Sequence, residues 1–146
     1  MKSLNNYLIA VATVLLTSTA LPEKGIDWKD VNELQELKQT DPRPVMIELY
    51  ADWCGWCKKM EKTTFIEPEV ADYLSTNYYT VKINGEHSRQ IELLGKIQTP
   101  KELIKDLKIE GYPTLLILND QLQLQKIAPG YKTAPQLIRL LKRNAD

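Results

Sequence analysis

The sequence predicts an α/β domain with a central mixed β-sheet, helices on both faces, and a C-terminal β-hairpin followed by a helix. Short apolar runs alternate along the chain with segments of helical periodicity, a pattern typical of sheets covered by helices. Two apolar runs near the C-terminus are separated by Asn119-Asp120, which indicates an antiparallel hairpin. The chain has 146 residues, enough for one domain with its own core.

The N-terminal half is expected to contain three helices and two strands. Apolar residues from Trp28 to Leu37 recur at helical spacing and predict a helix near residues 29–39. The run Val45–Tyr50 predicts a strand buried on both faces. The other expected elements are a helix over Cys54–Thr63, a helix over Pro68–Leu74 with proline in its first turn, and an alternating strand over Tyr78–Asn84.

The C-terminal half is expected to begin with two helical pieces between residues 85 and 110. The first covers Gln90–Ile97, and Thr99-Pro100-Lys101-Glu102 opens the second with a capping box and proline at its first position. This stretch is either a neutral surface insertion, which we favour, or a substrate lid or partner surface. The last expected elements are the strand Leu115–Leu118, the strand Gln121–Ala128 and an amphipathic helix capped by Thr133.

The only two cysteines, Cys54 and Cys57, lie in Trp53-Cys54-Gly55-Trp56-Cys57-Lys58, where the apolar run ends and a helix begins. Helical positions three apart share a face, so the two sulfurs can form a disulfide. A bridge that closes so small a loop stabilises little, about 2 kcal/mol, and a helix N-terminus favours thiolate over thiol. The spacing indicates a redox dithiol, although Cys-x-x-Cys is also half of a zinc site.

Several other chemistries lack the residues they need. Lys58 follows Cys57 where c-type haem attachment requires histidine. Two cysteines and the single His87, a loop residue expected to be solvated, fall short of four zinc ligands. There is no glycine-rich phosphate loop, no nucleophile elbow and no basic patch that suggests nucleic acid. We therefore expect no metal and no cofactor beyond the redox-active disulfide, no nucleic-acid partner, and a monomer.

Residues 1–20 carry the pattern of a secretory signal peptide. Lys2 supplies a positive start, Tyr7–Leu16 is apolar apart from Thr13, and Ser18-Thr19-Ala20 offers small residues for cleavage. The apolar run is short for a membrane span, which needs about 20 apolar residues. We expect a periplasmic or secreted protein with residues 21–146 as a single domain, and a retained N-terminal membrane anchor is the alternative.

Three motifs, taken in order, resemble the thioredoxin family. They are Trp-Cys-x-x-Cys-Lys between a strand and a helix, Gly111-Tyr112-Pro113-Thr114 before an apolar strand, and Gly130 ahead of the last helix. The resemblance covers roughly residues 28–144 and implies the thioredoxin fold and a thiol:disulfide oxidoreductase activity.

The resemblance also implies roles for four residues of the site. Cys54 matches the exposed nucleophile, which exchanges through a mixed disulfide, and Cys57 matches the buried resolving cysteine. Glu48 stands among apolar residues, so burial is expected to raise its pKa, and it matches the acid that relays a proton for Cys57. Lys82 matches the lysine that pairs with that acid. The alternatives are an edge-strand Glu48 that reaches solvent and a solvent-facing Lys82.

Four further residues are expected to bind substrate. Pro113 matches the family's cis-proline, with an ordinary trans turn as the alternative, and the Tyr112 backbone would receive an extended substrate segment. Trp53 matches a packing residue beside the cysteines. Trp56 departs from the pattern of cytosolic thioredoxins, in which proline is common at this position, and a large exposed indole there is a candidate docking surface.

These features together predict an exported thiol–disulfide oxidoreductase. We favour a reductant of protein disulfides that is recharged by a membrane-bound electron donor, because a small domain without a dimerisation segment argues against an isomerase. A disulfide oxidase or isomerase stays open. The alternatives from other classes are a metallochaperone that holds Cu(I) through Cys54 and Cys57, and a redox-silent interaction domain.

Overall fold

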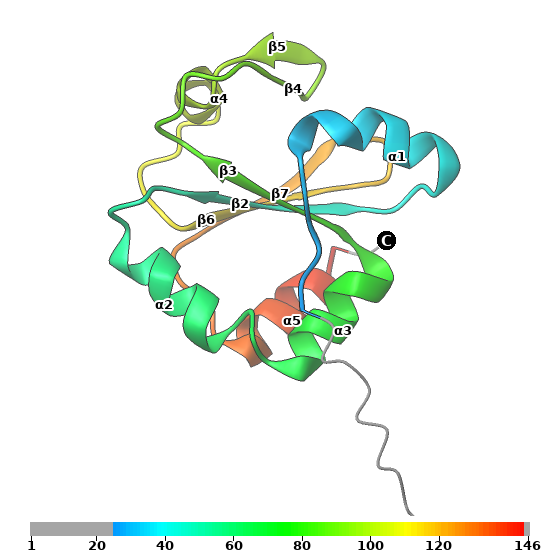
Figure 1. The fold of residues 1–146 in the computed structure, drawn as a ribbon, viewed down its shortest axis with the longest axis vertical. Coiled ribbons are helices and arrows are strands. Elements are labelled where there is room, and N and C mark those ends of the chain that lie inside the picture. Colours follow the sequence, from blue (N-terminus) through cyan, green and yellow to red (C-terminus); the bar gives the residue numbers. More distant parts are fainter. Residues whose placement is uncertain (1–24, 145–146) are drawn as a thin grey trace, which may run out of the picture.

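A five-stranded mixed sheet forms the centre of residues 25–144, the part of the chain that the computed structural model describes. Its strands are β1 (Trp28–Lys29), β2 (Val45–Tyr50), β3 (Tyr79–Asn84), β6 (Thr114–Leu118) and β7 (Leu124–Pro129). They lie in the order β1-β3-β2-β6-β7 (Figure 1). β1, β3 and β2 are parallel, whereas β6 is antiparallel to β2 and to β7. The predicted mixed sheet with a C-terminal hairpin is confirmed.

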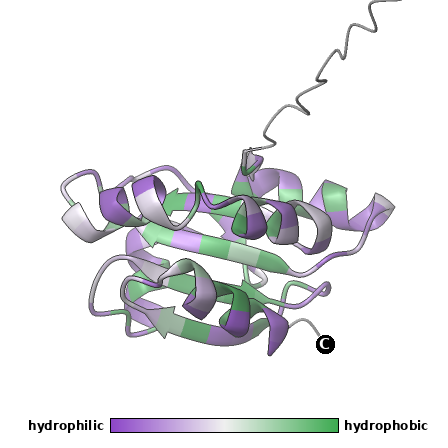
Figure 2. Ribbon diagram, turned by 90° about the horizontal axis from the view of Figure 1, so that it is seen from below, coloured by the Kyte–Doolittle hydropathy of each residue, from purple (hydrophilic) through white to green (hydrophobic). Residues whose placement is uncertain are grey.

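Helices cover both faces of this sheet, as predicted (Figure 1). One face carries α1 (Leu34–Thr40), α4 (Pro100–Asp106) and the small β4–β5 hairpin (Ile91–Leu93 and Lys96–Gln98). The other face carries α2 (Gly55–Thr63), α3 (Pro68–Asn77) and α5 (Ala134–Lys142). The helices show their polar residues on the outside, and the strands between them are largely apolar (Figure 2).

Alternation along β2 divides its side chains between two cores, because successive strand residues point to opposite faces. Ile47 and Leu49 belong to the core beneath α1 and α4, together with Leu103. Met46 belongs to the core beneath α3 and α5, together with Leu137. Because β2 is the middle strand and both of its faces are covered, any polar side chain on it is removed from water.

The predicted helix near residues 29–39 is only partly correct. Trp28 pairs with Thr80 in β1, a short 3-10 turn covers Val31–Glu33, and the α-helix begins at Leu34. Trp28 packs against the core beneath α3 and α5, whereas Leu34 packs against the opposite core. The helical spacing was thus produced by residues that belong to different elements.

The predicted helix over Gln90–Ile97 is wrong, because this segment forms the β4–β5 hairpin. Ile91 and Leu93 are buried while the residue between them is exposed, which is the two-residue period of a strand. Leu94 and Gly95, at φ 55° and 74°, make a tight turn of the kind that joins antiparallel strands. The stretch after β3 therefore contains one hairpin and one helix, rather than two helices.

The predicted signal peptide at residues 1–20 lies outside the described residues, so it stays a prediction, as does the single domain over residues 21–146. Within residues 25–144, every helix is too short or too polar to cross a bilayer.

Candidate functional site

The two cysteines lie where β2 leads into α2, beyond the carboxyl end of a central strand. They are joined in a disulfide with a Cα–Cα distance of 5.3 Å. Cys54 has extended backbone angles and is the N-cap of α2, and its Sγ accepts a hydrogen bond of 3.1 Å from the Cys57 backbone N–H. A sulfur in this position faces the positive end of the helix dipole and a backbone donor, both of which stabilise negative charge.

Both cysteines are buried, each with only 2% of its surface exposed. They form a small apolar cluster with Ala51, against which the rings of Tyr50 and Tyr112 pack. The burial of Cys57 agrees with its expected role, but the expected exposure of Cys54 is wrong for this disulfide-bonded state. Because so little of Cys54 is exposed, its surroundings must move before a substrate sulfur can reach it.

Glu48 lies fully buried on β2, on the same side of the sheet as Met46 and α2. Neither carboxylate oxygen has a hydrogen-bond partner among the described residues. Burial raises the pKa of Glu48 to about 7, because the nearby Lys82 charge only partly offsets the lost hydration, while the Glu61 charge raises the pKa further. The alternative of an edge-strand glutamate that reaches solvent is excluded by this central position.

Lys82 faces Glu48 directly across β2 and β3, with 3.6 Å between its Nζ and Glu48 Oε2. It is half-buried, and its ammonium lies 4.7 Å from the centre of the Tyr50 ring. Burial works against the charge, but the hydrogen bond to Glu61 and the two neighbouring carboxylates outweigh it and raise the pKa of Lys82. The alternative of a simple solvent-facing lysine does not describe this environment.

Glu61 on α2 also belongs to the site, although it was not predicted from the sequence. Its Oε1 accepts a hydrogen bond from Lys82 Nζ, so one ammonium lies between two carboxylates. Glu61 is four residues after Cys57, and positions four apart share a helix face. That spacing was the available sequence signal, and it identifies a second acid on the cysteine face of α2.

Trp53 is largely exposed but is fixed at two points. Its indole Nε1 donates a hydrogen bond of 2.8 Å to Glu86, which follows β3. Its ring meets the Tyr112 ring in a T-shaped contact with 5.9 Å between ring centres. The Tyr112 hydroxyl lies so close to Gly85 that a Cβ there would come within 2.0 Å of it. The tyrosine that packs over the cysteines is thus held between the residue before Cys54 and the end of β3.

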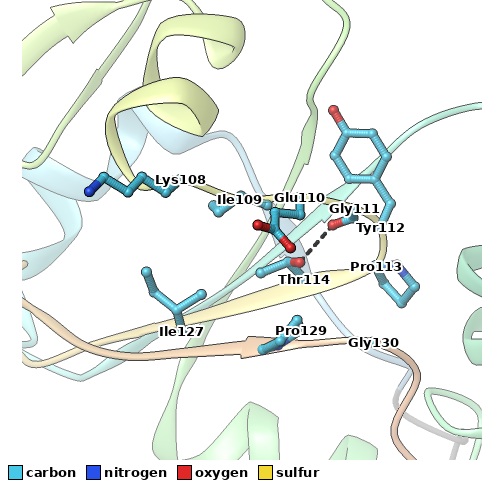
Figure 3. Close-up of a pocket in the computed structure, with 10 residues that line it drawn as sticks. All are labelled: Lys108, Ile109, Glu110, Gly111, Tyr112, Pro113, Thr114, Ile127, Pro129 and Gly130. Carbon is cyan, nitrogen blue, oxygen red and sulfur yellow. Dashed lines mark hydrogen bonds between the residues drawn. The ribbon is translucent and has the colours of Figure 1, made fainter.

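The Tyr112–Pro113 segment borders a hollow of about 380 Å³ (Figure 3). The peptide bond between these residues is cis. Gly130 N–H donates a 2.7 Å hydrogen bond to the Pro113 carbonyl, which ties this loop to the segment before α5. Figure 3 shows the Tyr112 ring turned away from the hollow, whose lower side is formed by Ile127 and Pro129 of β7.

Trp56 contacts other residues than Tyr112, and more than half of it is exposed. Its ring centre is 5.6 Å from that of Tyr131. The Lys59 ammonium lies near both rings, 4.7 Å from Trp56 and 5.2 Å from Tyr131. The residue between the two cysteines is thus an exposed indole that packs against a half-buried tyrosine and a lysine.

The expected site residues other than the cysteines form two groups. Glu48 and Lys82 make a charged pair that α2 meets through Glu61. Trp53 packs against Tyr112, which itself packs against the cysteine cluster, and Trp56 lies between the two cysteines in the sequence. Within residues 25–144, no three His, Cys, Asp or Glu side chains gather in a way that could hold a metal ion. A sulfur pair at a helix N-terminus can exchange electrons, and a carboxyl whose pKa lies near neutral can exchange protons.

Comparison with known proteins agrees with this geometry. A family model described as a thioredoxin-like domain matches residues 31–145. The thiol:disulfide interchange protein DsbD of Escherichia coli K12 is 31% identical over 110 residues, which are 72% of this chain and 18% of that protein. DsbD of Salmonella typhimurium is 37% identical over 97 residues, or 65% of this chain and 15% of that protein. The chain thus spans less than a fifth of the length of these relatives.

Solved structures also resemble this fold. A thioredoxin from Thermus thermophilus superposes with a TM-score of 0.66 at 18% identity, over 82% of this chain and 86% of that one. The oxidised C-terminal domain of Neisseria meningitidis DsbD superposes with a TM-score of 0.57 at 21% identity, over 76% of this chain and 88% of that one. At these identities the likeness concerns the fold.

Proposed function

The chain belongs to the thioredoxin-like domain family, and we propose that it is an exported thiol–disulfide oxidoreductase that reduces disulfides in other proteins. The observation that carries the proposal is the Cys54–Cys57 bridge at the N-terminus of α2, above a buried acid whose pKa is raised to about 7. Two of its relatives are named thiol:disulfide interchange proteins, which supports the same chemistry here.

In the proposed reaction the reduced protein donates two electrons to a substrate disulfide. The Cys54 thiolate attacks one substrate sulfur, forms a mixed disulfide and releases the other sulfur as a thiolate. The Cys57 thiolate then attacks Cys54 Sγ, which re-forms the bridge and releases the second substrate sulfur. Both Cys54 and Cys57 end oxidised, as they are in this structure, and the substrate ends as a dithiol.

Glu48 is the proposed proton acceptor for Cys57. A base works best when its pKa lies near the working pH, and burial brings this carboxyl to that range. Lys82 is a positioning residue, since its charge opposes the effect of burial on Glu48. Glu61 holds Lys82 in place through their hydrogen bond.

The substrate is proposed to approach the disulfide from the side of Tyr112 and Pro113. The Tyr112 ring packs against the cysteine cluster. We assign it as the cover that moves when a substrate sulfur arrives, and the backbone beside Pro113 would accept an extended segment of substrate. Export rests on the signal pattern in residues 1–20, and an oxidising compartment would require a membrane-bound donor to restore the dithiol.

The proposal is tested by trapping substrates in cells. Without Cys57 the mixed disulfide cannot be resolved, so a full-length Cys57→Ala protein should accumulate covalent complexes that dithiothreitol releases. The matched Cys54→Ala variant, which keeps one cysteine but lacks the nucleophile, should trap far less. Absence of complexes with Cys57→Ala, or equal trapping by both variants, would count against the proposal. Titration of the reduced protein with Cu(I) separates it from a metallochaperone, for which tight 1:1 binding is expected.

A further inference from the structure

The C-terminal part of the chain carries an uncompensated positive charge. The formal net charge of the whole chain is zero. Between Asp120 and Asp146, however, the sequence has no acidic residue, and its cations there are Lys126, Lys132, Arg139, Lys142 and Arg143. In the sequence these residues are spread over two elements and a loop, and the fold brings four of them together.

Four of these cations line one hollow of about 470 Å³ between β7 and α5. They are Lys126, Lys132, Arg139 and Arg143. Every ion pair found among residues 25–144 lies elsewhere, so these four charges have no carboxylate partner in the part of the chain that the structure describes. A concave surface lined by charges of one sign concentrates its potential and attracts opposite charge.

Lys132 is the most buried of the four. The residue is half-buried, whereas the other three are exposed, and its ammonium donates hydrogen bonds to the carbonyls of Pro129 and Gly130. Burial lowers the pKa of Lys132, and no neighbouring acid reverses this. An anion in the hollow would supply the missing countercharge.

This hollow is connected to the disulfide through the loop between β7 and α5. Gly130 is hydrogen-bonded to Pro113, which follows the Tyr112 that packs against the cysteines. Tyr131 contacts Trp56 and Lys59, and Thr64 at the end of α2 donates a 2.6 Å hydrogen bond to the Lys132 carbonyl. We use the term basic band for the cations that run from the disulfide to α5: Lys59, Lys132, Lys126, Arg139 and Arg143.

Acids lie around the disulfide end of the band. Glu67 and Glu69 line a separate hollow with Tyr131 and Thr133, and Glu110 lines the hollow that Pro129 and Gly130 border. The hollow between β7 and α5, by contrast, has no acidic residue in its lining. The excess of positive charge is therefore greatest there.

We propose that the basic band docks a carboxylate-rich segment of the protein whose disulfide Cys54 reduces. This proposal rests on the function proposed above and specifies the class of its substrate. A protein partner is favoured over a lipid surface because the band begins at Trp56 and Tyr131, beside the disulfide that the same partner must reach. Complementary charge of this kind speeds association and selects among partners.

The test uses two synthetic peptides that contain the same disulfide loop, one flanked by Asp and Glu and the other by Lys. We expect the reduced full chain to turn over the acidic peptide about tenfold faster than the basic one at low salt, and the preference to fade at high salt. In the double variant Lys126→Glu/Arg139→Glu the preference should disappear. The matched control Lys101→Glu/Lys105→Glu reverses two exposed charges on α4, across the sheet, and should keep it.

Two further measurements make the result unambiguous. Reduction of a small neutral disulfide by the wild type reports on the thiol chemistry itself, so its failure would refute the proposed function rather than the docking. Fluorescence anisotropy of labelled acidic peptide with the oxidised full chain reports on docking without any redox step. Equal affinity for the two peptides, or an undiminished preference in Lys126→Glu/Arg139→Glu, overturns the proposal. Binding to phosphatidylglycerol vesicles without peptide preference also overturns it and indicates a membrane surface instead.

Discussion

Glu48 and Lys82 face each other across β2 and β3, yet their closest atoms are 3.6 Å apart and neither Glu48 oxygen accepts a hydrogen bond from a described residue. Lys82 is bonded instead to Glu61. The buried acid thus feels a positive charge without being tied to it. This arrangement leaves its pKa close to neutral, where a carboxyl can both take up and release a proton.

The protonation of Glu48 makes the stability of the oxidised protein depend on pH. Its pKa is about 7 in the folded state and near 4.5 when the chain unfolds. Between these values the folded state holds the extra proton, so the free energy of unfolding falls as pH rises, by up to about 3 kcal/mol. The side chain of the Glu48→Gln variant cannot ionise, so its free energy of unfolding should not show this decrease as the pH rises. Urea unfolding at several pH values between about 5 and 8 measures it.

Glu36→Gln is the control for this experiment, because Glu36 is exposed on α1. It should unfold with the same pH dependence as the wild type. A Glu48→Gln protein that keeps the wild-type slope would show that another group is responsible.

Removing the charge of Lys82 and removing the charge of Glu61 should shift the pKa of Glu48 in opposite directions. Lys82→Met removes a charge that lowers this pKa, so the pKa should rise above about 7. Glu61→Gln removes a charge that raises it, so the pKa should fall. The carboxyl ¹³C chemical shift of Glu48, followed by NMR across a pH titration, measures both. Shifts of the same sign in the two variants would contradict the assigned geometry.

Local signals in the sequence were sufficient for much of the fold. The capping box at Thr99 is present, with the Thr99 side chain bonded to Glu102 N–H and the Glu102 side chain bonded to Thr99 N–H. Val45–Tyr50 is a strand with the predicted bounds, because a run of apolar residues suits a middle strand. Each of these features depends on residues close in sequence, where propensity and pattern act directly.

Features that depend on distant contacts were not predictable in the same way. The β4–β5 hairpin was taken for a helix because a segment of eight residues gives too few periods to separate the two patterns, although Gly95 marked its turn. Glu61 joined the site only because β3 brings Lys82 beneath α2. The covering of Cys54 by Tyr112 requires the close approach of Tyr112 to Gly85, 27 residues away in the sequence.

Gly85 is predicted to be intolerant of any side chain. A Cβ there would lie 2.0 Å from the Tyr112 hydroxyl and 2.6 Å from Ile104 Cδ1. Gly85→Ala should therefore destabilise the oxidised protein by about 1–3 kcal/mol, since both neighbours must shift. Thermal or urea unfolding measures the loss. Gly55→Ala is the control, because no atom lies within 4 Å of a Cβ at that position, and it should change stability little.

Removal of the Tyr112 hydroxyl should relieve part of this clash. Gly85→Ala should therefore lower the free energy of unfolding less in a Tyr112→Phe background than in the wild type. The difference is limited because the new Cβ still meets Ile104 and the Tyr112 ring carbon at 2.7 Å. Identical losses in the two backgrounds would show that the hydroxyl is not the atom that resists the new Cβ.

Trp53 and Trp56 should differ in their effect on access to the disulfide, although both are exposed. Trp53 holds Tyr112 through its ring edge and is itself held by Glu86, and Tyr112 packs over the cysteines. Trp53→Ala removes one aromatic contact and one hydrogen bond, so it should loosen the packing of Tyr112 against the cysteines. Reduction of the disulfide by dithiothreitol should then be about fivefold faster. Trp56 contacts Lys59 and Tyr131 instead, so Trp56→Ala should change the rate less than about twofold. Alkylation of the freed thiols at timed intervals gives both rates, and equal acceleration by the two substitutions would contradict the assignment of the cover to Tyr112.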